Sequence, residues 1–194
     1  MSDDLKILVI DESAVRADIL KEGLYDAGHT RVDWISDTVN LNERIAVIAP
    51  DVVLIDLENP NREALEEMFQ LCREVKRPIA MFVDKSDTSM IAASVDAGVS
   101  AYIVDGLKKE RIKPILDMAV SRFNVFTKLQ TELTDTRAAL EERKSIDRAK
   151  GILMKQKSIT EDEAYSLLRN AAMNQKRKIA DIAISVVSAA DVLK

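Results

Sequence analysis

Three acidic side chains stand where they could bind a metal ion or take part in phosphoryl chemistry. Asp11 and Glu12 follow an apolar run at 7–10, and Asp56 follows another at 52–55. Carboxylates that share one pocket repel one another unless a hard divalent cation such as Mg²⁺ neutralises them. A carboxylate held there can also act as a nucleophile toward a phosphoryl group. The simpler alternative, that acidic residues end strands because loops are polar, stays open at this point.

Short apolar runs predict the strands that must position these acids. Four of them are continuous and rich in β-branched residues, as expected for strands buried on both faces of a parallel sheet. They lie at 7–10, 52–55, 79–83 and 101–104, and 32–35 is a weaker fifth candidate. Five strands alternating with five helical patterns predict a doubly wound, flavodoxin-like α/β domain over residues 1–120. Ligands of such sheets bind beyond the carboxyl ends of the strands, so we expect the three acids in one crevice.

The helical patterns predict which side chains pack against the sheet. The first helical pattern places Val15 and Ile19 on one apolar face, together with Leu20 and Leu24. A later pattern places Met90, Ile91 and Val95 on another. Gly28 and Gly98 are placed to end two helices. His29 follows Gly28 in a predicted turn, so we expect a solvated side chain there.

The stretches 6–12, 50–56 and 97–102 resemble a response-regulator receiver domain. The resemblance implies that Asp56 is the phosphoacceptor and that Asp11 and Glu12, together with Asp56, bind Mg²⁺. It covers about 120 residues, the whole of the predicted α/β domain.

Two positions depart from the receiver pattern. Receivers carry Thr or Ser at the end of the fourth strand, where this chain has Val83, and Lys at the end of the fifth, where it has Asp105. An anion in the pocket opposes a phosphoryl group, and only Lys85 or Lys108 lies near enough in sequence to compensate. We therefore expect an atypical receiver that is regulated by a bound protein partner.

Residues 121–142 predict a coiled-coil connector that joins two copies of the chain. Apolar residues follow a heptad spacing, with Thr136 in the intervening position. They are Phe126, Leu129, Leu133 and Leu140. The alternative is a long amphipathic helix that packs on its own domain.

Residues 143–194 predict a small bundle of three helices with a basic surface. Thr160 and Glu163 form a capping box at the start of the second helix. Residues 1–120 hold 23 acidic and 14 basic side chains, whereas 121–194 hold 10 and 14, so the net charge changes from −9 to +4. Clustered cations suit phosphate contacts, although they also fit an ordinary solvated helix surface. The nucleic-acid-binding candidates are Arg148, Lys150, Lys155, Lys157, Arg169, Lys176, Arg177, Lys178 and, for stacking, Tyr165, which is equally consistent with a core position.

The stretches 146–154, 160–165, 168–173 and 179–183 resemble an ANTAR domain, the RNA-binding module of the AmiR and NasR transcription antiterminators. The whole chain is most similar to the NasT type, which acts in nitrate assimilation. The resemblance implies a homodimer that binds tandem hairpins in a nascent leader mRNA. It also implies a solute-binding-like sensor protein that sequesters the regulator until nitrate or nitrite arrives.

Composition narrows the remaining function classes. The 194 residues contain one histidine, no Gly-rich phosphate loop, and no Ser/His or Cys/His set, so we expect neither an enzyme nor a required cofactor beyond candidate Mg²⁺. Cys72 is the single cysteine, the N-terminus is acidic, and no apolar run reaches the roughly 20 residues of a membrane span. We therefore expect a cytoplasmic protein that binds no membrane.

Two other functions remain open at the level of sequence. A phosphorylation-dependent response regulator could bind DNA through a helix-turn-helix, which residues 178–183 superficially resemble, although we expect no DNA binding. A receiver with a helical dimerisation tail could also act purely through protein contacts.

Overall fold

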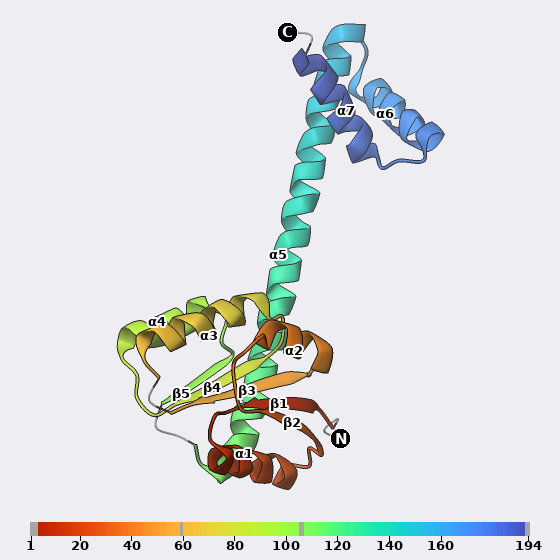
Figure 1. Cartoon of the computed structure of the whole chain (residues 1–194). Helices are drawn as coiled ribbons and strands as arrows, with labels where there is room; N and C mark the ends of the chain where they lie inside the picture. The colour runs from red at the N-terminus through yellow and green to blue at the C-terminus, as the bar shows by residue number, and fades with distance from the viewer. Residues whose placement is uncertain (1–3, 59, 105–106, 193–194) are drawn as a thin grey trace. The chain divides into compact units, whose positions relative to one another are not determined.

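The computed structural model describes residues 4–58, 60–104 and 107–192, which form two compact units divided between residues 127 and 128 (Figure 1). The first unit contains a five-stranded sheet whose order is β2-β1-β3-β4-β5, with every neighbouring pair parallel. The strands are β1 (Lys6–Ile10), β2 (Arg31–Ile35), β3 (Val52–Leu57), β4 (Ile79–Val83) and β5 (Ala101–Val104). The doubly wound α/β architecture predicted from the apolar runs is confirmed.

Helices cover both faces of this sheet and bury its side chains. They are α1 (Ala14–Asp26), α2 (Leu41–Ile48), α3 (Arg62–Glu74), α4 (Thr88–Asp96) and the first part of α5 (Lys109–Lys157). One core lies under α2, α3 and α4, and the other lies under α1 and α5, where Leu20 and Leu116 are 0% and 1% exposed (Figure 1). Successive strand residues alternate between the two cores, which is why the runs are apolar throughout.

Three expectations about individual side chains are wrong. Val15 and Ile19 in α1 are 73% and 37% exposed, because α1 packs through Ala17 and two leucines instead. Ile91 in α4 is likewise 44% exposed and Val95 is 59% exposed. His29 is only 2% exposed, and its ring Nδ1 accepts a hydrogen bond from the Leu5 backbone N–H at 3.4 Å.

The second unit is a helical bundle made by the last part of α5, α6 (Glu161–Gln175) and α7 (Ile179–Val192). Ala149, Leu168 and Ala183 from the three helices meet in its core with 0%, 1% and 0% exposure. The predicted capping box is present, since Thr160 Oγ1 accepts from the Glu163 N–H and Glu163 accepts from the Thr160 N–H. The three helices and the start of α6 at its capping box therefore follow the sequence prediction.

The stripe predicted for a coiled coil lies on α5 and is exposed in the single chain. Its four apolar side chains have exposed fractions between 46% and 62%; they are Phe126, Leu129, Leu133 and Leu140. The division into residues 1–120, 121–142 and 143–194 stays a prediction, because α5 runs through both boundaries without interruption.

Candidate functional site

The first candidate site lies at the carboxyl ends of β1, β3 and β4, where an arginine joins two aspartates. Arg16, from the first turn of α1, binds both oxygens of Asp56, with Nε–Oδ2 at 2.7 Å and Nη2–Oδ1 at 2.6 Å. The same guanidinium contacts Asp84, the residue after β4, at 3.1 to 3.2 Å. The Asp56 side chain is 0% exposed, so this bidentate pair is shielded from water. The pairing raises the pKa of Arg16, chiefly through its hydrogen bonds to Asp56.

Asp11 lies beside this pair and is buried without full compensation. Its Oδ1 accepts the Ser13 N–H at 2.8 Å, whereas its Oδ2 is buried and has no hydrogen-bond partner among the described residues. Burial raises the pKa of Asp11 to about 6, and the negative charge of Asp56 adds to the rise. The structure therefore brings Asp11 and Asp56 together, as expected, in a site where ionising Asp11 is costly.

The acids do not fit a Mg²⁺ site in this arrangement. Glu12 is exposed, and it lines an open hollow of about 490 Å³ together with Asp11 and Asp56. Both oxygens of Asp56 already bind the Arg16 cation. In the part of the chain that the structure describes, no group of three acids, histidines or cysteines is placed to hold a metal. A guanidinium provides here the positive charge that the prediction had assigned to Mg²⁺.

Of the two positions that depart from the receiver pattern, the structure describes Val83 but not Asp105. Val83 ends β4 and is 1% exposed, so no hydroxyl is present at that strand end. Asp105, named as an anion at the end of β5, lies outside the described residues. Lys85 and Lys108, the two lysines considered as compensating cations, are both exposed. The cation that pairs with Asp56 and Asp84 is Arg16 instead.

Arg16 is the functional residue that the sequence reasoning missed. Its position in the sequence could have indicated this role, because Arg16 stands five residues after Asp11, in the first turn of the helix that follows β1. A side chain in that turn lies at the same sheet edge as the strand's carboxyl end.

In the second unit, three of the candidate cations pair with carboxylates. Arg148 binds Asp191 of α7 through two hydrogen bonds of 2.9 and 3.0 Å. Lys150 contacts Asp147 at 2.7 Å and Glu161 of α6 at 2.6 Å, and these contacts raise the pKa of Lys150. The pair between Lys178 and Glu142 is longer, at 3.8 Å. These cations connect the helices of the bundle to one another.

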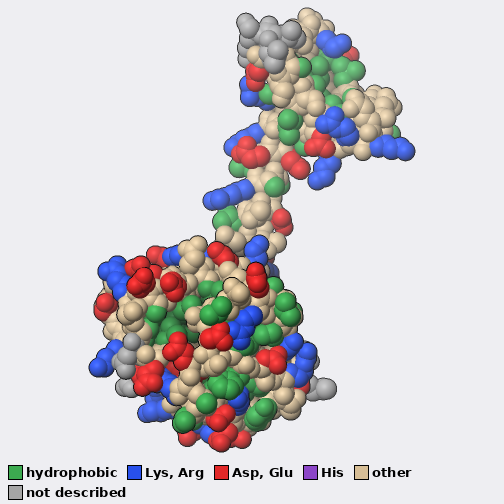
Figure 2. Space-filling view, viewed as in Figure 1, with side chains coloured by type: hydrophobic (Ala, Val, Ile, Leu, Met, Phe, Trp, Pro, Cys, Tyr) green, Lys and Arg blue, Asp and Glu red, His purple; other side chains and the backbone are tan. Residues whose placement is uncertain are grey.

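The other candidates in this unit have no carboxylate partner within the described residues. Arg177 contacts only neutral acceptors, at 3.4 Å. Tyr165 is 42% exposed and lies outside the bundle core. The unpaired cations are Lys155, Lys157, Arg169 and Lys176. Figure 2 shows Lys and Arg side chains projecting from the visible face of this unit, and numerous Asp and Glu side chains on that of the first.

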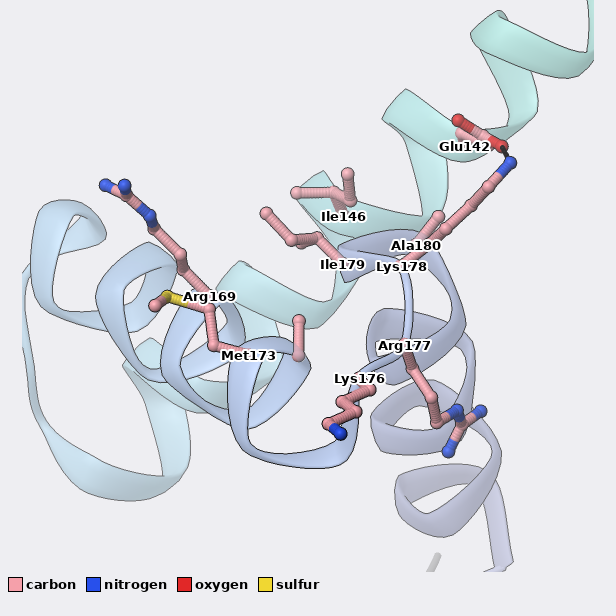
Figure 3. Close-up of a pocket in the computed structure, with 10 residues that line it drawn as sticks. Glu142, Ile146, Arg169, Met173, Lys176, Arg177, Lys178, Ile179 and Ala180 are labelled. Carbon is pink, nitrogen blue, oxygen red and sulfur yellow. Dashed lines mark ion pairs between the residues drawn. The ribbon is translucent and has the colours of Figure 1, made fainter.

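An open hollow of about 660 Å³ lies between the three helices of the second unit. Ile146 of α5 and Ile179 of α7 extend into it from one side, and Arg169 and Met173 of α6 lie opposite (Figure 3). The basic run at the turn also lines this hollow, with Arg177 pointing along α7 and Lys178 turning toward Glu142 (Figure 3). The second candidate site is therefore a hollow with apolar walls and several cations at its edge. Among these, Arg169, Lys176 and Arg177 have no carboxylate partner within the described residues.

A five-stranded α/β unit with acids at its strand ends, followed by a basic helical bundle, defines a receiver joined to an effector module. Residues 7–117 match the response regulator receiver domain, and residues 134–187 match the ANTAR domain. The chain belongs to the response-regulator receiver family, and more particularly it is an ANTAR-domain response regulator.

Two of the known proteins with similar sequences are named as regulatory proteins. The transcriptional regulatory protein PdtaR of Mycobacterium tuberculosis is 28% identical over 184 residues, covering 93% of this chain and 89% of PdtaR. A nitrate regulatory protein of Klebsiella oxytoca is 30% identical over 76 residues, which are 39% of this chain and 19% of that protein.

A response regulator from Thermotoga maritima supports the fold of the first unit. It is 22% identical, with a TM-score of 0.51 over 59% of this chain and 96% of that one. No described helix is both long and apolar enough to cross a membrane.

Proposed function

We propose that this chain is a cytoplasmic transcription antitermination regulator that binds tandem hairpins of a nascent leader mRNA through residues 143–194. The ANTAR match over residues 134–187 carries the proposal. The unpaired cations described in this unit support it, since Lys and Arg without carboxylate partners are available to phosphates. Hairpin loops in turn expose unstacked bases that protein side chains can stack on and hydrogen-bond.

A homodimer formed through α5 would match the two hairpins. The exposed stripe from Phe126 to Leu140 has the heptad spacing of a two-stranded coil, and a second copy would cover it. Two RNA-binding units held in one dimer make the second hairpin contact intramolecular, which raises avidity.

The receiver is proposed to respond to a protein partner instead of to phosphorylation. Arg16 pairs with both Asp56 and Asp84 within the chain, so an internal cation already balances part of the negative charge that Mg²⁺ would otherwise balance. The nitrate regulatory protein among the relatives favours a nitrate or nitrite signal, delivered by a solute-binding-like sensor that sequesters this chain.

RNA binding is tested by selection from a library of tandem hairpins with randomised loops, followed by mobility shifts of the full-length chain. We expect binding that weakens with salt and that duplex DNA does not compete. Equal affinity for an unstructured strand, or preferential binding of duplex DNA, would refute RNA-hairpin recognition. The DNA outcome would favour the helix-turn-helix alternative.

The receiver proposal needs a separate measurement. Incubation of the full-length chain with acetyl phosphate and Mg²⁺ should leave its intact mass unchanged. Stoichiometric phosphorylation that Asp56→Ala abolishes would make Asp56 a phosphoacceptor after all.

A further inference from the structure

An acidic hollow of about 490 Å³ opens at the carboxyl ends of β1 and β3. Four of the described residues that line it are acidic and none is basic; the acids are Asp11, Glu12, Asp56 and Glu58. Arg16 hydrogen-bonds both Asp56 and Asp84, so its single charge is divided between two carboxylates. The hollow therefore keeps an excess of negative charge after this internal cation is counted.

Asp11 is the acid of the hollow that lacks a full set of partners. It is 4% exposed, and its Oδ2 has no hydrogen-bond partner among the described residues. A buried oxygen without a donor costs free energy, which a donor on a ligand would recover. The unsatisfied oxygen therefore indicates a ligand that donates a hydrogen bond, and the surrounding carboxylates favour a cationic donor.

The lining of the hollow favours a long cationic side chain over a metal ion. Within residues 4–58, 60–104 and 107–192, no group of three acids, histidines or cysteines is placed to hold a metal. Partly buried apolar side chains complete the wall; they belong to Leu57, Pro60 and Ala64. Lys and Arg lay their aliphatic stems along apolar surface while the charged end reaches polar groups. A hydrated Mg²⁺ ion makes no comparable use of such a wall.

The N-terminus of α3 borders the same hollow and opposes a cation. Its partial charge is about +0.5, and Asn61 already caps it by accepting the Ala64 N–H at 2.8 Å. The four carboxylates of the hollow exceed this partial charge, even when one guanidinium is subtracted as well. The net preference of the hollow is therefore for a positive ligand.

We propose that this hollow takes a lysine or arginine side chain of the protein partner that regulates the receiver. The charged end of that side chain contacts Asp11 Oδ2 between Glu12 and Glu58. Its aliphatic stem lies along Leu57 and Pro60. The inference rests on the proposed regulation by a protein partner and deepens it, because it names the chemistry by which the partner is recognised.

The test uses a phage-displayed library of disulfide-closed peptides, selected on the full-length chain. Binders that also bind the Asp11→Asn chain are discarded. We expect the remaining peptides to depend on one Lys or Arg, so that its replacement by Met weakens binding at least about tenfold, the low end for close charge pairs across an interface. On the Asp11→Asn chain, the same replacement should cause little further loss, because both changes remove one contact.

Two further variants separate the hollow from the general acidity of the receiver. Glu58→Gln should weaken binding about threefold, as expected for an exposed charge pair. The matched control is Glu67→Gln, which removes an exposed acid from a different hollow, lined by α2 and α3, and should leave binding unchanged. Equal losses for the two variants would overturn the site, because overall charge would then govern binding.

Urea denaturation of Asp11→Asn separates lost affinity from lost folding. Since this substitution removes a poorly compensated buried charge, the unfolding midpoint should not fall. If no Asp11-dependent peptide is found, or if such peptides bind equally well without their cations, the proposal is wrong.

Mg²⁺ and acetyl phosphate distinguish the failure of this site from the failure of the proposed function. Replacing NaCl by MgCl₂ at constant ionic strength should leave the peptide bound, and complete release would make the hollow a metal site instead. Stoichiometric phosphorylation of Asp56 would remove the proposed regulation by a partner. Loss of the peptide result alone, with Asp56 unmodified and RNA binding intact, would remove only the side-chain site.

Discussion

The two candidate sites of this chain handle their charges in opposite ways. In the first unit, Asp56 and Asp84 share the Arg16 guanidinium, and the Asp56 side chain is 0% exposed. In the second unit, Arg169 and Lys176 stand at the surface without a carboxylate partner within the described residues. The acids of the first site share a cation from within the chain, whereas the second site leaves cations available to a ligand of negative charge.

This contrast makes the proposed binding of an anionic polymer compatible with a net charge of −5. The charge that matters is local, because at physiological salt the screening length is only about 8 Å. An acidic receiver and a basic effector unit can therefore act independently on partners of opposite charge. Substitutions that change one site at a time test the contrast, and the largest effect is expected at Arg16.

Removing the internal cation should destabilise the first unit most. Arg16→Met leaves the buried Asp56 charge unpaired, which typically costs about 3 kcal/mol or more in the free energy of unfolding. Urea denaturation at pH 7.5 measures the loss. Arg44→Met is the control, since it breaks an exposed pair with Asp37 and should cost much less.

The effect of Mg²⁺ on stability is a second test of the same pocket. Because Arg16 already binds both Asp56 oxygens, millimolar Mg²⁺ should leave the unfolding midpoint of the wild-type chain unchanged. A clear stabilisation by Mg²⁺ would show that the metal ion displaces Arg16 from the Asp56 carboxylate.

Removing the unpaired cations should weaken RNA binding without unfolding the bundle. A quadruple Gln variant is expected to lose affinity about 100-fold near 0.15 M salt, and the slope of log affinity against log salt should fall by about one for each phosphate that is no longer bound. Its sites are Lys155, Lys157, Arg169 and Lys176. The matched control changes four exposed receiver cations, Arg31, Arg73, Lys76 and Arg77, and should leave the slope unchanged. Equal effects of the two variants would mean that net charge alone governs binding.

Asp11 provides a pH-dependent test of the buried pocket. Its pKa of about 6 means that the folded state binds more protons than the unfolded state between about pH 4 and 6, so stability falls as pH rises through this window. Asp11→Asn should therefore gain about 1 kcal/mol relative to wild type at pH 7.5, after allowance for solvent screening, and little at pH 4. A gain that does not depend on pH would mean that Asp11 is not titrating in this range.

The smallest expected effect is a difference in thermal stability between substitutions of a paired and an unpaired lysine on α5. Lys150→Gln should lower the thermal unfolding midpoint slightly, because it breaks contacts to Asp147 and to Glu161 of α6. Lys155→Gln, on the same helix but without a carboxylate partner among the described residues, should leave the midpoint unchanged. If Lys155→Gln destabilised the chain as much as Lys150→Gln, the division into paired and unpaired cations would fail.

The strands were the most predictable part of the chain. Runs such as 7–10 and 79–83 are apolar at every position because both faces of the sheet are covered, and their short length and β-branched residues favour strands over buried helix segments. Their order also placed Asp11 and Asp56 together at one edge, since β1 and β3 are neighbours.

Individual side chains were less predictable, because their burial depends on what packs against them. The α1 face was misassigned at Val15 and Ile19, since the helix packs through its two leucines together with the small residues Ala17 and Gly23, which hydrophobic periodicity does not select. His29 was expected in solvent, but the chain entering β1 passes close enough for the ring to accept the Leu5 N–H.

By itself, the sequence determined the class of the molecule: a parallel α/β unit, a long heptad-patterned helix and a capped helical bundle of opposite charge. These features depend on local periodicity, turn chemistry and composition, which each segment carries alone. Only the tertiary structure decided which charged side chains form ion pairs within the chain. Arg16 and Asp56 are 40 residues apart, and Lys150 and Glu161 are 11 apart, so whether a cation is paired or free is a matter of through-space distance. That distance distinguishes the receiver pocket, where Arg16 pairs with two carboxylates, from the surface proposed to bind RNA.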